Sequence, residues 1–274
     1  MRFSKLGKKY IFNAQDVIVN SNNSVEIDAH ILDIVSEVDR YVYDIEGVKP
    51  DSVYLRGSCL EESVDLALDI DIVMVYNERI VVKGNYGFVL SDSAWSYSDQ
   101  LSELCSKIGI FPDVTLMCRE EFIASEELRF ISKKVYGSGE NLSLTTLSLK
   151  SLDIEYGNVI LLQSHRNINT IKKILYGDFI ASRQVLERVV KGLIEDFYRD
   201  CAIGIMLRNR MYSRSMYDCH NTLLESIPYL SDKLDNVMDL FLNTDDYSYQ
   251  DIKPMIHEMV YLSEEIQHLR YKEK

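Results

Sequence analysis

The stretch "LRGSCLEESVDLALDIDIVMV", residues 55–75, combines a glycine–serine turn with two aspartates that begin an apolar run. Side chains alternate between the two faces of an extended strand, so Asp69 and Asp71 point to one face, about 7 Å apart. Ile70 and Ile72 then point to the other face, toward a core. Because two neighbouring carboxylates repel each other, the stretch predicts a strand that presents this pair to a cation.

Magnesium is the cation that this pattern favours, because Mg²⁺ binds one or two carboxylates together with phosphate oxygens. Asp113 lies near the start of another predicted strand, "IFPDVTLMC", residues 110–118. If that strand neighbours the first one, three carboxylates converge on two ions about 3.5–4 Å apart. Such a pair activates an attacking oxygen and stabilises a leaving pyrophosphate.

The turn at Gly57 and Ser58 complements the carboxylates. A glycine between a strand and a helix lets backbone N–H groups approach a phosphate closely, and the helix presents its positive end to the same anion. Ser58 adds a hydroxyl donor. Arg56, just before the turn, is either a phosphate contact or a surface ion-pair partner. These parts predict a site for a nucleoside triphosphate and its metal ions.

The remaining pattern predicts an α+β protein. Residues 28–46 form an amphipathic helix that Gly47 ends, "SVYL" and "DIDIVMVY" are strands, and residues 94–108 are helical. Beyond residue 142 the pattern becomes helical, with segments at 181–208, 215–226, 229–242 and a last helix with Pro254 in its first turn. We therefore expect a mixed β-sheet domain with flanking helices at residues 1–142 and an all-helical bundle domain at residues 143–274.

Composition restricts the partners and the compartment. The formal net charge of -13 disfavours an extended nucleic-acid surface and favours a cationic acceptor. The chain has no run of 18 apolar residues and no apolar stretch behind its basic start, so neither a membrane segment nor a signal peptide is expected. Five scattered cysteines without a C-x-x-C pair favour reduced thiols, a cytoplasmic location and no zinc site.

At this point the residues resemble a known family. "RGSCLEESVDLALDID" is similar to the signature of the nucleotidyltransferase superfamily related to DNA polymerase β. In that signature a Gly-Ser turn precedes Asp-x-Asp by about ten residues, and a third aspartate lies on a later strand. Gly57, Ser58, Asp69, Asp71 and Asp113 match it in order and spacing. The helical second half looks like that of the two-domain aminoglycoside nucleotidyltransferases.

The resemblance implies a role for each matched residue. Asp69 and Asp71 would hold both Mg²⁺ ions, and Asp113 would hold the catalytic ion and help to deprotonate the acceptor hydroxyl. Gly57 and Ser58 would grip the β- and γ-phosphates. The implied reaction transfers NMP, as AMP from ATP, to a hydroxyl of a small, cationic, aminoglycoside-like antibiotic and releases pyrophosphate.

Several alternatives remain open at this stage. The chain could transfer AMP to a protein side chain, as in toxin–antitoxin systems. It could also be a catalytically degenerate module that binds a nucleotide or a partner, because Glu62 and Leu68 replace a glycine and a serine often found in the family. Arg214 and His220 have the R-x5-H spacing that resembles the ribonuclease motif of helical HEPN domains. A homodimer is compatible with each of these functions.

Overall fold

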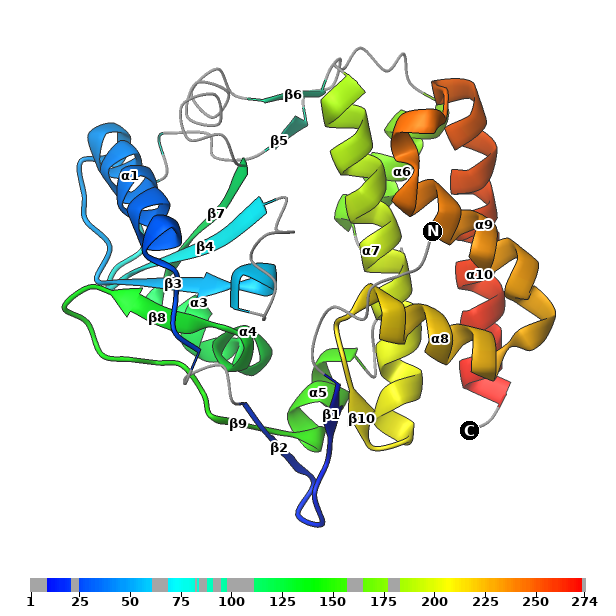
Figure 1. The fold of residues 1–274 in the computed structure, drawn as a ribbon, viewed down its shortest axis with the longest axis horizontal. Helices are drawn as coiled ribbons and strands as arrows, with labels where there is room; N and C mark the ends of the chain where they lie inside the picture. Colours follow the sequence, from blue (N-terminus) through cyan, green and yellow to red (C-terminus); the bar gives the residue numbers. More distant parts are fainter. Residues whose placement is uncertain are drawn as a thin grey trace. The chain divides into compact units, whose positions relative to one another are not determined.

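The computed structural model describes residues 9–20, 25–60, 69–81, 83, 88–90, 95–97, 111–156, 165–176 and 183–272. The contacts between residues divide the chain into two compact units (Figure 1). The sheet unit comprises Asn13–Val89 and Tyr97–Ser151, and the helical unit comprises Met1–Phe12, Leu90–Ser96 and Leu152–Lys274. The protein is therefore α+β, with a sheet-containing unit and a mainly helical one.

A four-stranded mixed sheet forms the centre of the sheet unit. Its order is β7-β4-β3-β8, with bounds β3 (Ser52–Arg56), β4 (Asp69–Tyr76), β7 (Phe111–Cys118) and β8 (Lys133–Tyr136). β4 runs parallel to β7, whereas β3 is antiparallel to both β4 and β8. The three strands expected around residues 52, 69 and 111 are confirmed.

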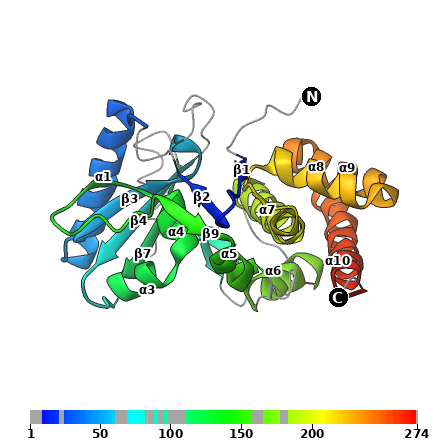
Figure 2. The ribbon, with the colours of Figure 1, turned by 90° about the horizontal axis from the view of Figure 1, so that it is seen from below.

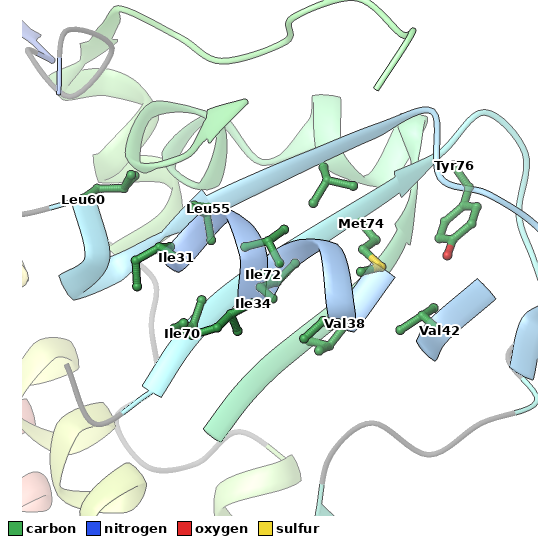
Figure 3. Packing of buried hydrophobic residues seen from close by; sticks show 13 residues of the cluster. Ile31, Ile34, Val38, Val42, Leu55, Leu60, Ile70, Ile72, Met74 and Tyr76 are labelled. Carbon is green, nitrogen blue, oxygen red and sulfur yellow. The ribbon is translucent and has the colours of Figure 1, made fainter. Parts of the chain in front are cut away.

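Helix α1 (Ala29–Glu46) packs on one face of this sheet (Figure 3). The Asp28 side chain accepts a hydrogen bond from the His30 backbone N–H at 2.7 Å, and Gly47 ends the helix in a left-handed conformation, as expected. The buried side chains between them include Ile31, Ile34, Val38, Val42, Leu55, Ile70, Ile72, Met74 and Tyr76. Even-numbered β4 residues therefore face α1, which confirms the predicted alternation for them.

The opposite face of the sheet is covered by α3 (Arg119–Ala124) and α4 (Glu126–Ile131). Val73 and Val75 of β4 belong to this second core, together with Tyr54 and Phe122, whose rings lie 4.6 Å apart. The Tyr54 hydroxyl accepts a hydrogen bond from the Leu142 backbone N–H at 3.0 Å. This bond attaches the segment after β8 to the sheet.

Short strands complete the arrangement. β2 (Val17–Val19) pairs antiparallel with β9 (Thr146–Ser148), and α5 (Leu149–Tyr156) follows directly. β5 (Phe88–Leu90) and β6 (Trp95–Tyr97) form a two-stranded sheet. The helix expected from residue 94 is therefore wrong at residues 95–97, because Trp-Ser-Tyr alternates aromatic and polar residues in the manner of a strand. Residues 98–108 lie outside the described part of the chain.

Helix α7 (Arg183–Arg208) contacts α8, α9 and α10 of the helical unit (Figure 2). The other elements are α6 (His165–Tyr176), α8 (Met216–Ser226), η4 (Pro228–Leu230), α9 (Ser231–Leu242), η5 (Thr244–Asp246) and α10 (Tyr249–Lys272). A short strand, β10 (Met211–Tyr212), pairs with β1 (Tyr10–Ile11), so the unit is not purely helical. Among the described residues, no helix combines the length and apolar character needed to cross a membrane.

The last helix starts earlier than its proline suggests. α10 begins at Tyr249, which places Pro254 inside the helix and not in its first turn. The Ser248 backbone N–H donates to Asp251 Oδ2 at 3.0 Å, and the Asp251 N–H donates back to Ser248 Oγ at 3.3 Å. This reciprocal cap sets the start of the helix, and it outweighs the preference of proline for a first turn.

Candidate active site

Asp71 and Asp113 lie side by side on neighbouring strands. They are register partners in the parallel pair of β4 and β7. Register partners in adjacent strands place their side chains on the same face of a sheet, and adjacent strands lie about 4.8 Å apart. Two of the three carboxylates predicted from the sequence are therefore neighbours, as the strand pairing required.

Arg56 connects these two carboxylates. It is the last residue of β3 and pairs with Asp71 in the antiparallel register. Its Nη2 atom lies 3.2 Å from Oδ1 of Asp71 and 3.7 Å from Oδ2 of Asp113. The row Arg56–Asp71–Asp113 thus crosses three strands, and the guanidinium offsets part of the repulsion between the acids.

The row is open to solvent but not fully exposed. The side chains of Arg56 and Asp71 are 24% and 23% exposed, whereas that of Asp113 is 51% exposed. The same face of β4 becomes apolar two residues further on, at the buried Val73. The carboxylates therefore lie at the polar edge of an otherwise packed face, where ions and small molecules can reach them.

Gly57 follows Arg56 and packs against Asp71. Its φ angle is +76°, a conformation that side-chain-bearing residues rarely adopt. A Cβ atom at this position would lie 2.2 Å from Oδ2 of Asp71. Both the backbone conformation and the contact therefore require glycine, and the turn η2 (Gly57–Leu60) begins directly beside the carboxylate.

Two predicted site residues are described only through their backbone. Asp69 is the first residue of β4 and pairs with Phe111, and Ser58 belongs to η2. The side chains of both lie outside the described part of the structure, as do residues 61–68, which include Glu62 and Leu68. Asp69 still occupies the same strand face as Asp71, because positions two apart in a strand share a face.

The described side chains are compatible with a divalent cation. Within that part of the chain, which does not include the side chain of Asp69, no three His, Cys, Asp or Glu side chains form a metal-binding group. Two carboxylates nevertheless face each other, and a guanidinium already lies between them as a stand-in cation. Carboxylate oxygens are the ligands that Mg²⁺ prefers, so the donor set matches this ion.

Arg56 is the site residue whose role the sequence left open. The structure makes it an ion-pair partner, but one that bridges the two candidate catalytic acids and not an unrelated surface pair. The sequence shows that Arg56 precedes the glycine turn. It does not show that Arg56 pairs with Asp71, because that pairing depends on the strand register. Register is a property of the folded sheet and is not readable from one strand alone.

The R-x5-H pair of the helical unit has a different setting. His220 is buried, with Nδ1 3.2 Å from the Tyr198 hydroxyl and Nε2 3.0 Å from Oδ1 of Asp235. The Arg214 Nη1 atom donates to the Tyr156 hydroxyl at 3.4 Å. A histidine held in this way connects α7, α8 and α9, so packing accounts for it better than a ribonuclease site does.

A surface hollow of about 360 Å³ also lies on the helical unit. Its lining residues are Lys9, Tyr217, Asp218, Asn221, Thr222 and Glu225. The carboxylate of Asp218 accepts a hydrogen bond from the Ser213 hydroxyl at 2.8 Å, which gives it a structural partner. None of the predicted site residues lines this hollow.

No protein-family model matches the chain, and no curated protein matches it significantly.

Proposed function

We propose that the protein is a Mg²⁺-dependent nucleotidyltransferase. It transfers NMP, as AMP from ATP, to a hydroxyl of a small cationic acceptor and releases pyrophosphate. The observation that carries this proposal is the register pairing of Asp71 with Asp113 directly beside the Gly57 turn. A carboxylate pair next to a backbone turn that suits phosphate is what transfer from a triphosphate requires.

Each residue of the site has a separate role in this reaction. Asp69, Asp71 and Asp113 would hold Mg²⁺, which when bound supplies neutralisation of the triphosphate charge. Backbone N–H groups of the turn that starts at Gly57, with Ser58, bind the β- and γ-phosphates. Asp113, which is more exposed than Asp71, accepts the proton of the acceptor hydroxyl as its oxygen bonds to the α-phosphorus. The bond from that phosphorus to the pyrophosphate breaks on the opposite side.

The charge of the chain supports a cationic acceptor. The formal net charge is -13, and the row Arg56–Asp71–Asp113 contains two acids and one base. A negative field raises the local concentration of cations and speeds their encounter with the site. An aminoglycoside-like polyamine alcohol carries both the positive charge and the hydroxyl that the reaction needs, which makes it the first acceptor class to test.

One observation favours a second candidate, a nucleotide-binding module without catalysis. Arg56 already lies between Asp71 and Asp113, so a permanent guanidinium in place of the metal would give a site that binds without transferring. The two candidates differ in one property: only the enzyme takes up a divalent ion at these carboxylates.

A transfer assay tests the proposed reaction. The full chain, incubated with ATP labelled at the α-phosphate, Mg²⁺ and a panel of polyamine alcohols, should produce a labelled acceptor. Asp71→Asn and Asp113→Asn should each lose this product, whereas Asp33→Asn, at an exposed α1 position, should retain it. Label on a protein band would instead support protein AMPylation, and bound ATP without any transfer would support the module.

A further inference from the structure

We infer that Arg56 and the divalent ion exclude each other, so that nucleotide and metal load the site together. In this structure the guanidinium lies between Asp71 and Asp113, where a cation held by both acids would lie. It leaves when a triphosphate arrives to receive it. This inference rests on the proposed function, because it concerns the same carboxylates and the same turn.

The first step is competition for the same oxygens. A single nitrogen of Arg56 lies 3.2 Å from one carboxylate and 3.7 Å from the other. An ion that bridges the two acids needs oxygens from both of them, at about 2.0–2.1 Å for Mg²⁺. A guanidinium and a divalent cation repel strongly at such a separation. The carboxylates can therefore hold one or the other, but not both, at this position.

Exchange of the guanidinium for a metal ion requires that part of Arg56 can move. The backbone of Arg56 is fixed by the β3–β4 pairing, and its neighbour Leu55 is fully buried under α1. Displacement of the guanidinium therefore has to come from the Arg56 side chain and not from its backbone. That side chain is 24% exposed, so it has a route to solvent without unfolding of the strand.

After it leaves the carboxylates, the guanidinium would bind the phosphates of the nucleotide. Gly57, the next residue, starts the turn at which we propose the phosphates bind. Arginine forms strong, forked hydrogen bonds with phosphate oxygens. With a triphosphate on the turn, Arg56 exchanges one anion for another, so the nucleotide offsets the loss of its contacts with the two carboxylates.

The consequence is positive coupling between the two ligands. Metal binding without nucleotide is weakened by the competing guanidinium, and a triphosphate removes that competition. Because coupling is reciprocal, metal strengthens nucleotide binding by the same factor. Arg56 is thus a positioning residue that keeps divalent ions out of a site that holds no triphosphate.

Binding of Mn²⁺, followed by the electron paramagnetic resonance of the free ion, tests this without relying on catalysis. Arg56→Met keeps the aliphatic stem and removes the charge, so nucleotide-free Mn²⁺ affinity should rise about tenfold. The further gain in Mn²⁺ affinity on addition of α,β-methylene-ATP should shrink in the same variant. Arg56→Lys retains the charge and should stay near the wild type in the absence of nucleotide.

Arg40→Met is the matched control. It removes the same charge from the same unit, at an exposed pair in which Arg40 Nη2 lies 2.9 Å from Glu37 Oε2. Its Mn²⁺ affinity should equal that of the wild type. Circular dichroism melts establish that each variant is folded, and Arg56→Gln replaces Arg56→Met if the latter is not.

The outcomes separate this inference from the proposed function. If Arg56→Met binds Mn²⁺ no more tightly than the wild type, while Asp71→Asn loses wild-type binding, the exclusion by Arg56 is wrong and the metal site stands. If no variant binds Mn²⁺ at these carboxylates, with or without the analogue, both the proposed function and the inference are wrong.

Discussion

Asp71 and Asp113 occupy one register position of the parallel pair formed by β4 and β7. Their carboxylates come from segments far apart in the sequence, yet one guanidinium nitrogen lies within 4 Å of both. This juxtaposition arises from backbone pairing of two strands, so it does not depend on flexible side chains or loops. A rigid frame of this kind suits a site that has to hold reacting groups in a fixed geometry.

Asp71→Asn and Asp113→Asn should separate activity from stability. These acids lie at the solvent-accessible edge of the sheet, where an ion pair contributes about 1 kcal/mol or less to folding. We expect urea unfolding to shift by no more than about that amount, while nucleotidyl transfer is lost. A large drop in the free energy of unfolding would show that the row is a structural pair and not a reaction site.

Gly57→Ala should destabilise the sheet unit by about 1–3 kcal/mol. The added Cβ meets Oδ2 of Asp71 at 2.2 Å, in a backbone conformation that alanine tolerates poorly. Gly192→Ala is the matched control, because Gly192 lies within α7 and a Cβ there meets no atom within 4 Å. It should stabilise the protein by about 0.5–1 kcal/mol, since alanine favours a helix. Equal effects of the two changes on urea unfolding would contradict the geometry at Gly57.

Tyr54→Phe should cost about 1–3 kcal/mol, because it leaves a buried backbone N–H without its acceptor. The Tyr54 hydroxyl accepts from the Leu142 N–H at 3.0 Å and donates to the Glu140 carbonyl at 3.2 Å. Tyr229→Phe, at a side chain with 65% exposure, should leave the unfolding midpoint unchanged. Hydrogen exchange at Leu142 provides the local measurement: protection that survives in Tyr54→Phe would argue against this bond.

His220 should make the protein less stable in mild acid. Burial against α7 lowers the pKa of His220 below its usual value of 6.5, and the partly exposed Asp235 opposes this only in part. A histidine whose pKa is lowered by folding stays neutral in the native state while it takes up a proton in the unfolded chain. Its contribution is therefore complete above pH 6.5 and declines as the pH falls toward the lower native pKa.

Urea titrations between pH 5 and 7.5 measure this dependence. The slope of stability against pH in this range should decrease in His220→Gln, while His257→Gln, at an exposed position, should keep the wild-type slope. A wild-type protein that gains stability on acidification through this range would mean that the Asp235 contact dominates and that the pKa is raised.

The sequence was sufficient for some elements and not for others. The alternation of Asp71 with Ile70 and Ile72 predicted the strand and its two faces, because a period of two has one structural meaning. It did not reveal which strand pairs with β4, since pairing depends on packing across the whole sheet. For the same reason, the position of Arg56 between Asp71 and Asp113 could not be predicted from the sequence.

Local competition explains the errors in the element bounds. Pro254 suggested a helix start, but the cap formed by Ser248 and Asp251 lies one and a half turns earlier and sets the bound. At Trp95–Tyr97 a helical expectation failed because two aromatic residues flank a serine, a pattern that fits a strand equally well. Both signals were present in the sequence, and only the folded chain shows which one prevails.

The most direct test of the proposed site is a crystal structure of the protein with Mn²⁺ and α,β-methylene-ATP, with the metal located by its anomalous scattering. We predict an anomalous peak in contact with the carboxylates of Asp71 and Asp113, the phosphates on the turn at Gly57, and the Arg56 guanidinium moved from the acids to the phosphates. A nucleotide and metal bound away from these two carboxylates, or Arg56 still between them with the nucleotide in place and no metal, would contradict the proposal.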